Sequence, residues 1–295
     1  MNYKFLPLYS FVSKELFDVV VNKYSKEFDV SGYQLKHHPQ EDSFSFSKKF
    51  PIFCVGDGAT LEPKLGEKYP NPSGAFLVTD KFVKLMVKEC EKEYSHLNSN
   101  KLKQIFKKGN QEVKKINKRY GRINSKLNYL DFDLFCATSA LGIIKNDELY
   151  WFTIADSFVV IFNAKGKQKF LSPNGWRFIQ MPKKLEGKEK RIYIRRNLRN
   201  GFKSNKKIGY GVINGENKAI KYLDYGVKNL DDGDLIFIGT DGYEEYIKIK
   251  KFINLFVKWN KNIKSKIRKL EKELIKKDCD KFGHERTVFV IKYKN

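Results

Sequence analysis

The sequence predicts an α+β fold, because strand-like segments follow one another along the chain while helix-like segments are grouped separately. Short, apolar, β-branched runs that end at turn residues are typical of strands rather than of buried helices. Such runs occupy residues 50–55, 132–144, 148–154, 158–163, 234–239 and 287–293. A three-residue gap, Lys145-Asn146-Asp147, separates the second and third runs and predicts a β-hairpin. This succession argues against a repeating βαβ fold.

Helical signals are fewer and longer. Thr79-Asp80 can cap a helix that runs to about Tyr94, and Asn98 or Ser99 can begin another that runs to about Arg119. A long, basic, amphipathic helix is expected over residues 244–277. Its apolar residues recur at spacings of three and four, with lysines on the other face.

Length and composition favour a single folded domain over residues 1–295. Hydrophobic residues make up 41% and aromatic residues 15%, which is enough for a sizeable core, and no repeat or low-complexity linker interrupts the chain. The 58 basic against 34 acidic residues give a net charge of +24. That charge favours polyanionic partners such as phosphorylated protein, nucleic acid or an anionic membrane, although a lysine-rich solvated surface explains it equally well.

The four cysteines form no C-x-x-C pair, so neither a disulfide framework nor a zinc site is expected. No apolar run approaches the roughly 20 residues that a membrane-spanning helix needs, and the N-terminus lacks a signal-peptide layout. We therefore expect a soluble protein of the reducing cytoplasm, without membrane insertion.

Two Asp-Gly pairs, Asp57-Gly58 and Asp241-Gly242, each come directly after an apolar strand. Each would place a carboxylate at the end of its strand, and glycine would let the backbone approach a ligand closely. Such sites could supply oxygen ligands to a hard cation such as Mg²⁺ or Mn²⁺. Alone, however, either pair is more typical of an ordinary turn.

Three further acidic positions stand beside predicted strands. Asp156 lies between two apolar runs, the pair Glu41-Asp42 precedes an aromatic run, and His284-Glu285 precedes the last strand. Taken singly, each is typical of a turn or of solvated surface.

Together and in this order, these segments resemble the metal-dependent serine/threonine protein phosphatases, the PPM or type 2C family. The resemblance spans about residues 30–293. The matching segments are QEDSF (40–44), VGDGA (55–59), IADSFVVIF (154–162), YGVINGE (210–216), GDLIFIGTDGYEE (233–245) and HERTVFVI (284–291). Each motif is weak alone, but an ordered series in matching strand contexts is specific. The resemblance implies an α-β-β-α sandwich of two antiparallel sheets flanked by helices.

The resemblance also implies a centre of two Mn²⁺ or Mg²⁺ ions. Asp57 matches the aspartate that bridges both ions, the Gly58 carbonyl matches a ligand of the second, and Asp241 matches a ligand of the first. Glu41 matches the acid that holds the second ion, partly through water, and Asp42 supports it.

Other positions are less complete matches. Asp156 and Glu245 match positions linked to a third, weaker metal site, and Glu245 replaces the more usual aspartate. On the last strand either His284 or Glu285 stands for the usual aspartate ligand, and the preference of hard cations for oxygen favours Glu285.

Two departures concern substrate and proton transfer. Ala59 stands where some members carry a histidine proposed as the general acid. The arginine that binds substrate phosphate in some members is not evident, and His37 or His38, which lies in that region, is a candidate phosphate contact.

The function implied is hydrolysis of phosphoserine and phosphothreonine in proteins by a metal-activated water, with Asp57 and Asp241 at its centre. The alternative is a catalytically degenerate regulatory or binding module of the same fold. The basic run Arg191–Arg199 is the better candidate for a phosphopeptide or nucleic-acid contact.

Overall fold

The computed structural model describes residues 2–14, 16, 40–59, 72–130, 132–179, 182, 185–204 and 206–294. Two five-stranded sheets are found within these residues. In order across the first sheet lie β1 (Asn2–Ser10), β12 (Arg286–Lys294), β11 (Leu235–Gly239), β6 (Phe158–Phe162) and β7 (Gln168–Leu171). In order across the second lie β10 (Asp224–Asn229), β5 (Glu148–Ile154), β4 (Ala137–Lys145), β3 (Ile52–Gly58) and β2 (Ser43–Phe46). All neighbouring strands in both sheets are antiparallel.

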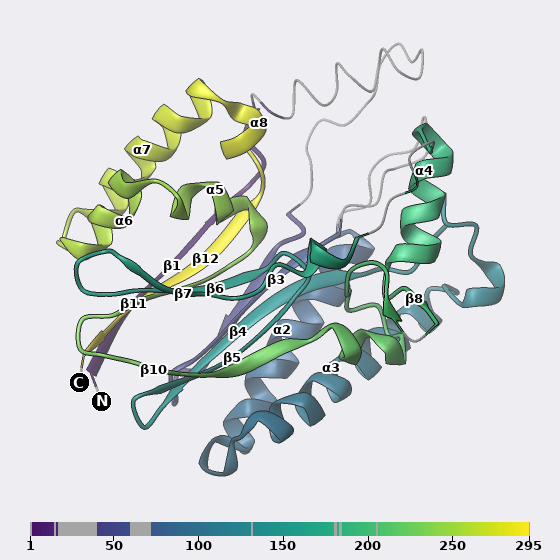
Figure 1. Cartoon of the computed structure of the whole chain (residues 1–295), viewed down its shortest axis with the longest axis horizontal. Coiled ribbons are helices and arrows are strands. Elements are labelled where there is room, and N and C mark those ends of the chain that lie inside the picture. Colours follow the sequence, from purple (N-terminus) through teal and green to yellow (C-terminus); the bar gives the residue numbers. More distant parts are fainter. Residues whose placement is uncertain are drawn as a thin grey trace.

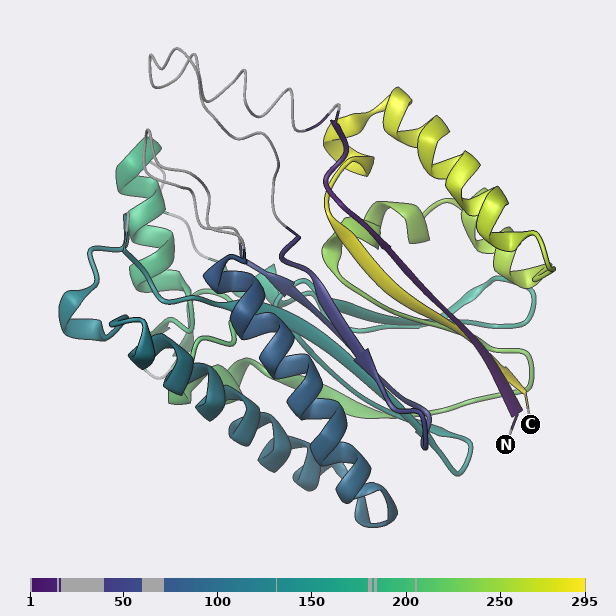
Figure 2. The same ribbon diagram turned by 180° about the vertical axis from the view of Figure 1, so that it is seen from behind.

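The two sheets pack face to face, and helices cover both outer faces (Figures 1 and 2). The space between the sheets is filled by apolar side chains from both, including Phe53, Ile236 and Phe289. Antiparallel sheets supply alternate side chains to a common core in this way. The predicted α+β class and the sandwich are therefore both confirmed.

The second sheet is covered by α2 (Gly74–Lys92) and α3 (Ser99–Arg119). The first is covered by α5 (Glu244–Ile247), α6 (Lys250–Val257), α7 (Ile263–Lys277) and α8 (Cys279–Phe282). The remaining described elements are short, namely α4 (Gly187–Tyr193), the hairpin β8 (Phe202–Lys203) and β9 (Lys206–Lys207), and six short 3₁₀ or π helices. These short helices are η1 (Tyr94–His96), η2 (Asn124–Lys126), η3 (Gly175–Phe178), η4 (Ile194–Leu198), η5 (Asn217–Tyr222) and η6 (Asp241–Tyr243). Among the described helices, none is long and apolar enough to cross a membrane.

The first two predicted helices differ in how well their starts were placed. Asn98 caps α3, as expected, by accepting from the Lys101 N–H at 3.0 Å. The expected start of α2 at Thr79-Asp80 is wrong, because Ser73 caps this helix by accepting from Phe76 N at 3.1 Å. Thr79 lies inside the helix, where its hydroxyl donates to the Ala75 carbonyl.

The prediction of one long helix over residues 244–277 is also wrong, because the segment is divided into α5, α6 and α7. Ile249 adopts an extended conformation between the first two, and α6 ends at Val257. Asn260 then accepts from the backbone N–H of Asn262, a local hydrogen bond that favours a turn over a helix. The apolar stripe survives the breaks because all three helices pack on one face of the first sheet.

The predicted hairpin is confirmed between β4 and β5, with Asn146 and Asp147 both at positive φ in its turn. The first of its strands begins later than expected, at Ala137. Strand β3 continues through Asp57 to Gly58, so the first Asp-Gly pair lies in the strand and not in a turn after it.

Candidate metal centre

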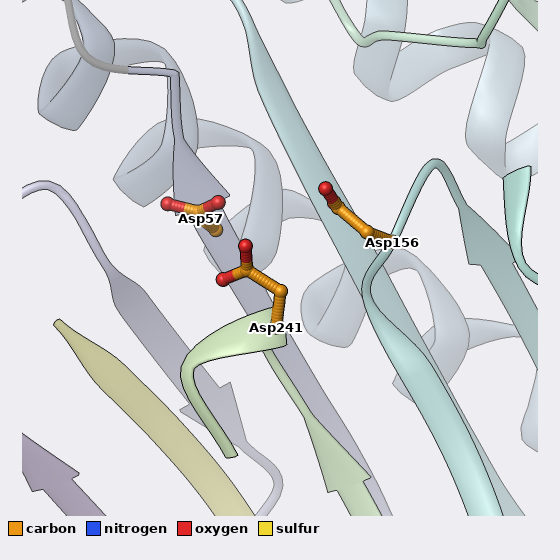
Figure 3. A group of neighbouring side chains, drawn as sticks. All are labelled: Asp57, Asp156 and Asp241. Carbon is orange, nitrogen blue, oxygen red and sulfur yellow. The ribbon is translucent and has the colours of Figure 1, made fainter. Parts of the chain in front are cut away.

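Three aspartates from separate elements meet at one end of the sandwich. Asp57 is the penultimate residue of β3, Asp241 begins η6 after β11, and Asp156 lies in the connection from β5 to β6. One carboxylate oxygen from each lies within 4.8 Å of those of the other two (Figure 3). Each sheet therefore supplies one aspartate, and a connection between the sheets supplies the third.

Glycine follows two of these aspartates because the chain is closely packed there. A Cβ atom on Gly58 would lie 2.9 Å from both the Cβ and the carbonyl oxygen of Glu41, and 3.1 Å from the Ala75 carbonyl carbon. A Cβ on Gly242 would overlap the carbonyl oxygen of Glu285. The glycines thus allow further acidic segments to approach the aspartates.

Those segments carry three more acids, Glu41, Asp42 and Glu285. Glu41 and Asp42 are buried, and their backbone N–H groups each donate to Glu285 Oε1 at 2.5 Å. The Thr240 hydroxyl donates to Asp42 Oδ2 at 2.9 Å and accepts from the Thr287 N–H at 2.9 Å. Direct hydrogen bonds therefore tie the segment before β2 to the ends of β11 and β12.

Asp57 and Asp156 are half-buried and Asp241 is more exposed, but the crowding of acids with limited access to water makes their ionisation unfavourable. Burial, followed by the charges of Asp42, Asp241, Asp156 and Glu285, raises the pKa of Asp57 well above its ordinary value. Burial likewise raises the pKa of Asp42 and of Asp241 to about 6 and that of Asp156 to about 7. The pKa of Glu285 is raised to about 9, by burial and then by the charge of Asp42. Without a cation, these raised pKa values favour the retention of protons by the cluster.

The residues fit a divalent cation. Every candidate side-chain ligand in the described cluster is a carboxylate, the ligand type that hard cations prefer. Asp156 Oδ1 is buried and has no hydrogen-bond partner among the described residues, although buried polar atoms are normally partnered. A cation would satisfy this oxygen and remove the repulsion between the acids.

The last strand and the helix after Asp241 each offer two candidate ligands, His284 or Glu285 and Glu244 or Glu245, and the members of each pair lie in different surroundings. The exposed ring of His284 contacts the Asp280 carbonyl oxygen through Nε2 at 2.6 Å, whereas Glu285 contacts the cluster. Glu245 forms an ion pair with Lys248 at 2.6 Å. Its neighbour Glu244 also pairs with Lys248, at 3.1 Å, and its charge adds, after burial and the neighbouring aspartates, to the raised pKa values of Asp156 and Asp241. In the sequence, the pair Glu244-Glu245 was the signal that could have indicated Glu244 as a neighbour of the site.

Other predicted positions lie away from this cluster or outside the described residues. His37 and His38 are outside the described residues. The arginine-rich run is partly internal: the side chains of Arg195 and Arg199 are only 7% and 10% exposed, and Arg199 pairs with Asp133 at 2.6 Å. A groove of about 390 Å³ between α2 and α3 contains none of the clustered carboxylates.

Trp176 is a neighbour of the site that the motifs did not indicate. Its indole Nε1 donates to Asp156 Oδ2 at 2.6 Å. No motif marks a tryptophan at this distance from the aspartate in sequence, so the contact is visible only in the folded chain.

Solved structures of known proteins share the fold described above. No protein-family model and no curated protein matches the sequence. Among solved structures, the Mycobacterium tuberculosis serine/threonine phosphatase PstP/Ppp is 11% identical, with 100% of both chains covered and a TM-score of 0.55. The catalytic domain of PstP in complex with two manganese ions is 11% identical, with 99% of both chains covered and a TM-score of 0.54.

A further similar structure is the PPM Ser-Thr phosphatase MsPP from Mycobacterium smegmatis in complex with cacodylate. It is 10% identical, covers 99% of this chain and 98% of its own, and has a TM-score of 0.53. The chain therefore has the fold of the PPM-type serine/threonine phosphatases, which confirms the fold that the ordered motifs implied.

Proposed function

We propose that this chain is a divalent-metal-dependent phosphatase that hydrolyses phosphoserine and phosphothreonine in proteins. The observation that carries the proposal is the meeting of Asp57, Asp156 and Asp241 within 4.8 Å at one end of a PPM-type fold. The PstP catalytic domain was solved with two manganese ions and MsPP with cacodylate, a tetrahedral oxyanion, and both similar structures support the proposal.

In the proposed centre, Asp57, Asp241, the Gly58 carbonyl, Glu41 and Glu285 would together hold two cations. Asp42 supports these ligands through its bond from Thr240. Bound Mn²⁺ or Mg²⁺ would supply a water of lowered pKa and would screen charge on the phosphoryl oxygens. Asp156, with Glu244 or Glu245, would serve a third and weaker cation.

The chain's own contribution is to hold these carboxylates rigidly before any ligand arrives. Asp57 lies in a strand paired on both sides, and Asp241 is fixed by the short turn that follows β11. Preorganised ligands avoid the cost of ordering them during the reaction. The net charge of +24 favours a phosphorylated protein as the anionic substrate. Nucleic acid remains a separate prediction from the same charge.

The test is hydrolysis of an aryl phosphate and of phosphothreonine and phosphotyrosine peptides, with Mn²⁺ or with a chelator. Activity should require Mn²⁺ and favour the phosphothreonine peptide. Asp57→Asn and Asp241→Asn should each lower the rate by at least about 100-fold, the upper range for disturbing a metal's surroundings. Asp231→Asn is the matched control, because Asp231 is an exposed aspartate paired with Lys169. Full activity in Asp57→Asn, or in chelator, would contradict the proposal.

A further inference from the structure

Trp176 connects the acidic cluster to a separate part of the chain. Its indole N–H donates to one oxygen of Asp156, at 2.6 Å, while its ring stacks on Tyr210 with centroids 4.6 Å apart and planes 10° from parallel. The other oxygen of Asp156 is the buried atom that has no partner among the described residues. The two carboxylate oxygens of Asp156 therefore differ: Oδ2 accepts a hydrogen bond from Trp176, and Oδ1 has no partner among the described residues.

The turn that carries Trp176 is fixed on both sides. Before it, the Gly175 N–H donates to the Ala155 carbonyl at 2.6 Å, and a Cβ on Gly175 would lie 2.5 Å from that oxygen. After it, Arg177 forms two hydrogen bonds with Asp224 on β10, at 2.8 and 3.0 Å. These contacts hold the indole in place even though 44% of Trp176 is exposed.

The hydroxyl of Tyr210, the residue that stacks on Trp176, contacts a buried ion pair. Arg199 Nε donates to the Tyr210 hydroxyl at 3.3 Å, and Arg199 Nη1 pairs with Asp133 at 2.6 Å. The Tyr210 N–H also donates to the Leu198 carbonyl at 3.0 Å. The position of the Asp156 carboxylate is thus linked, through two stacked rings, to the segment that contains Arg195 and Arg199.

We propose that Trp176 is a positioning residue for cation binding at Asp156. Its indole N–H holds Asp156 Oδ2 and leaves Oδ1 directed to the cation, while the Tyr210 stack holds the indole. Partners that orient a metal-binding carboxylate commonly change affinity about 10–100-fold when they are removed. This inference rests on the proposed metal-dependent function and adds a residue outside the expected ligand set.

Trp176→Phe tests the inference, because it retains an aromatic ring for the stack and removes the N–H. Trp259→Phe is the matched control, since Trp259 packs against Phe256 among the helices of the first sheet. Two readouts are used: Mn²⁺ affinity by calorimetry and quenching of tryptophan fluorescence by paramagnetic Mn²⁺. In the 295-residue chain, Trp176→Phe should lose most of the quenching and bind its weakest cation about tenfold less tightly. Trp259→Phe should retain both properties.

A double-mutant cycle separates positioning from general damage to the fold. If Trp176 acts through Asp156, adding Trp176→Phe to Asp156→Asn should weaken Mn²⁺ binding no further. Equal Mn²⁺ affinity in wild type and Trp176→Phe would overturn the inference, as would an additive loss in the double variant. Failure of the wild type to bind Mn²⁺ would instead overturn the proposed function.

Discussion

Gly242 and Glu285 are in direct contact where β11 ends and β12 is about to begin, and the Glu285 carbonyl leaves no room for a side chain on Gly242. Gly242→Ala should therefore force the two strand ends apart and displace Glu285 from the cluster. We expect a loss of about 1–3 kcal/mol in the free energy of unfolding, as for overpacked interiors, together with weaker Mn²⁺ binding. Urea unfolding and calorimetry measure the two effects. Unchanged stability would show that the contact is not tight.

The acidic cluster should make the metal-free protein less stable as the pH rises. The pKa values of Asp42, Asp241, Asp156 and Glu285 are raised to about 6, 6, 7 and 9, whereas carboxyl groups in an unfolded chain titrate near about 4. Between these limits the folded state binds more protons than the unfolded state, so the free energy of unfolding falls with rising pH.

We expect this fall to exceed about 1 kcal/mol between pH 5 and pH 9, since each pKa unit corresponds to about 1.4 kcal/mol. Urea unfolding in a chelator at several pH values measures it, and saturating Mn²⁺ should reverse the trend. Asp57→Asn supplies the control, because it removes the central carboxylate and should flatten the pH dependence. Stability that rises over this range in chelator would contradict the assignment of a strained acidic cluster.

Glu285 rather than His284 should be the ligand supplied by the last strand. Glu285→Gln is expected to lower Mn²⁺ affinity by about 10–100-fold, because it replaces a charged oxygen in the cluster. His284→Ala should have little effect, since the ring is exposed and contacts the Asp280 carbonyl. Calorimetric titration distinguishes the two. A large loss in His284→Ala with none in Glu285→Gln would reverse the assignment.

Glu244 and Glu245 offer a similar comparison. Both glutamates pair with Lys248, Glu245 at 2.6 Å and Glu244 at 3.1 Å, and the charge of Glu244 also contributes to the raised pKa values of Asp156 and Asp241. Both glutamates are partly exposed, so we expect a modest loss, about threefold, in the affinity of the weakest cation for Glu244→Gln. Glu245→Gln should change it less. Competition between Mn²⁺ and Mg²⁺ at increasing concentrations measures this affinity. A larger loss in Glu245→Gln than in Glu244→Gln would support Glu245, the position that the family resemblance implies.

Local patterns predicted much of the fold. The β4–β5 hairpin and the cap of α3 depend on neighbouring residues, and both lie where the sequence placed them. The division of residues 244–277 was not predictable from periodicity, because the apolar stripe continues across both breaks. Strand β1 was also missed, since it is defined by pairing with β12 at the other end of the chain.

The candidate site could be predicted only in part, for a similar reason. Asp57, Asp156 and Asp241 follow recognisable motifs, and the order of those motifs implied that the three would meet. Trp176 reaches Asp156 through a turn fixed by distant contacts, so no local pattern marks it. The sequence already favoured Glu285 over His284 as the ligand, and the hydrogen bonds that Glu285 accepts from the segment before β2 add support that no sequence pattern shows.

The most direct test of the metal centre is calorimetric titration of the wild-type protein, Asp57→Asn and Asp241→Asn with Mn²⁺, at neutral pH and after removal of bound metal. The wild type should bind Mn²⁺ in the micromolar to millimolar range and release protons on binding, because the carboxyl groups of the cluster have raised pKa values. Both variants should lose this binding. A wild-type protein that takes up no Mn²⁺, or variants that bind it as tightly as the wild type, would contradict the account.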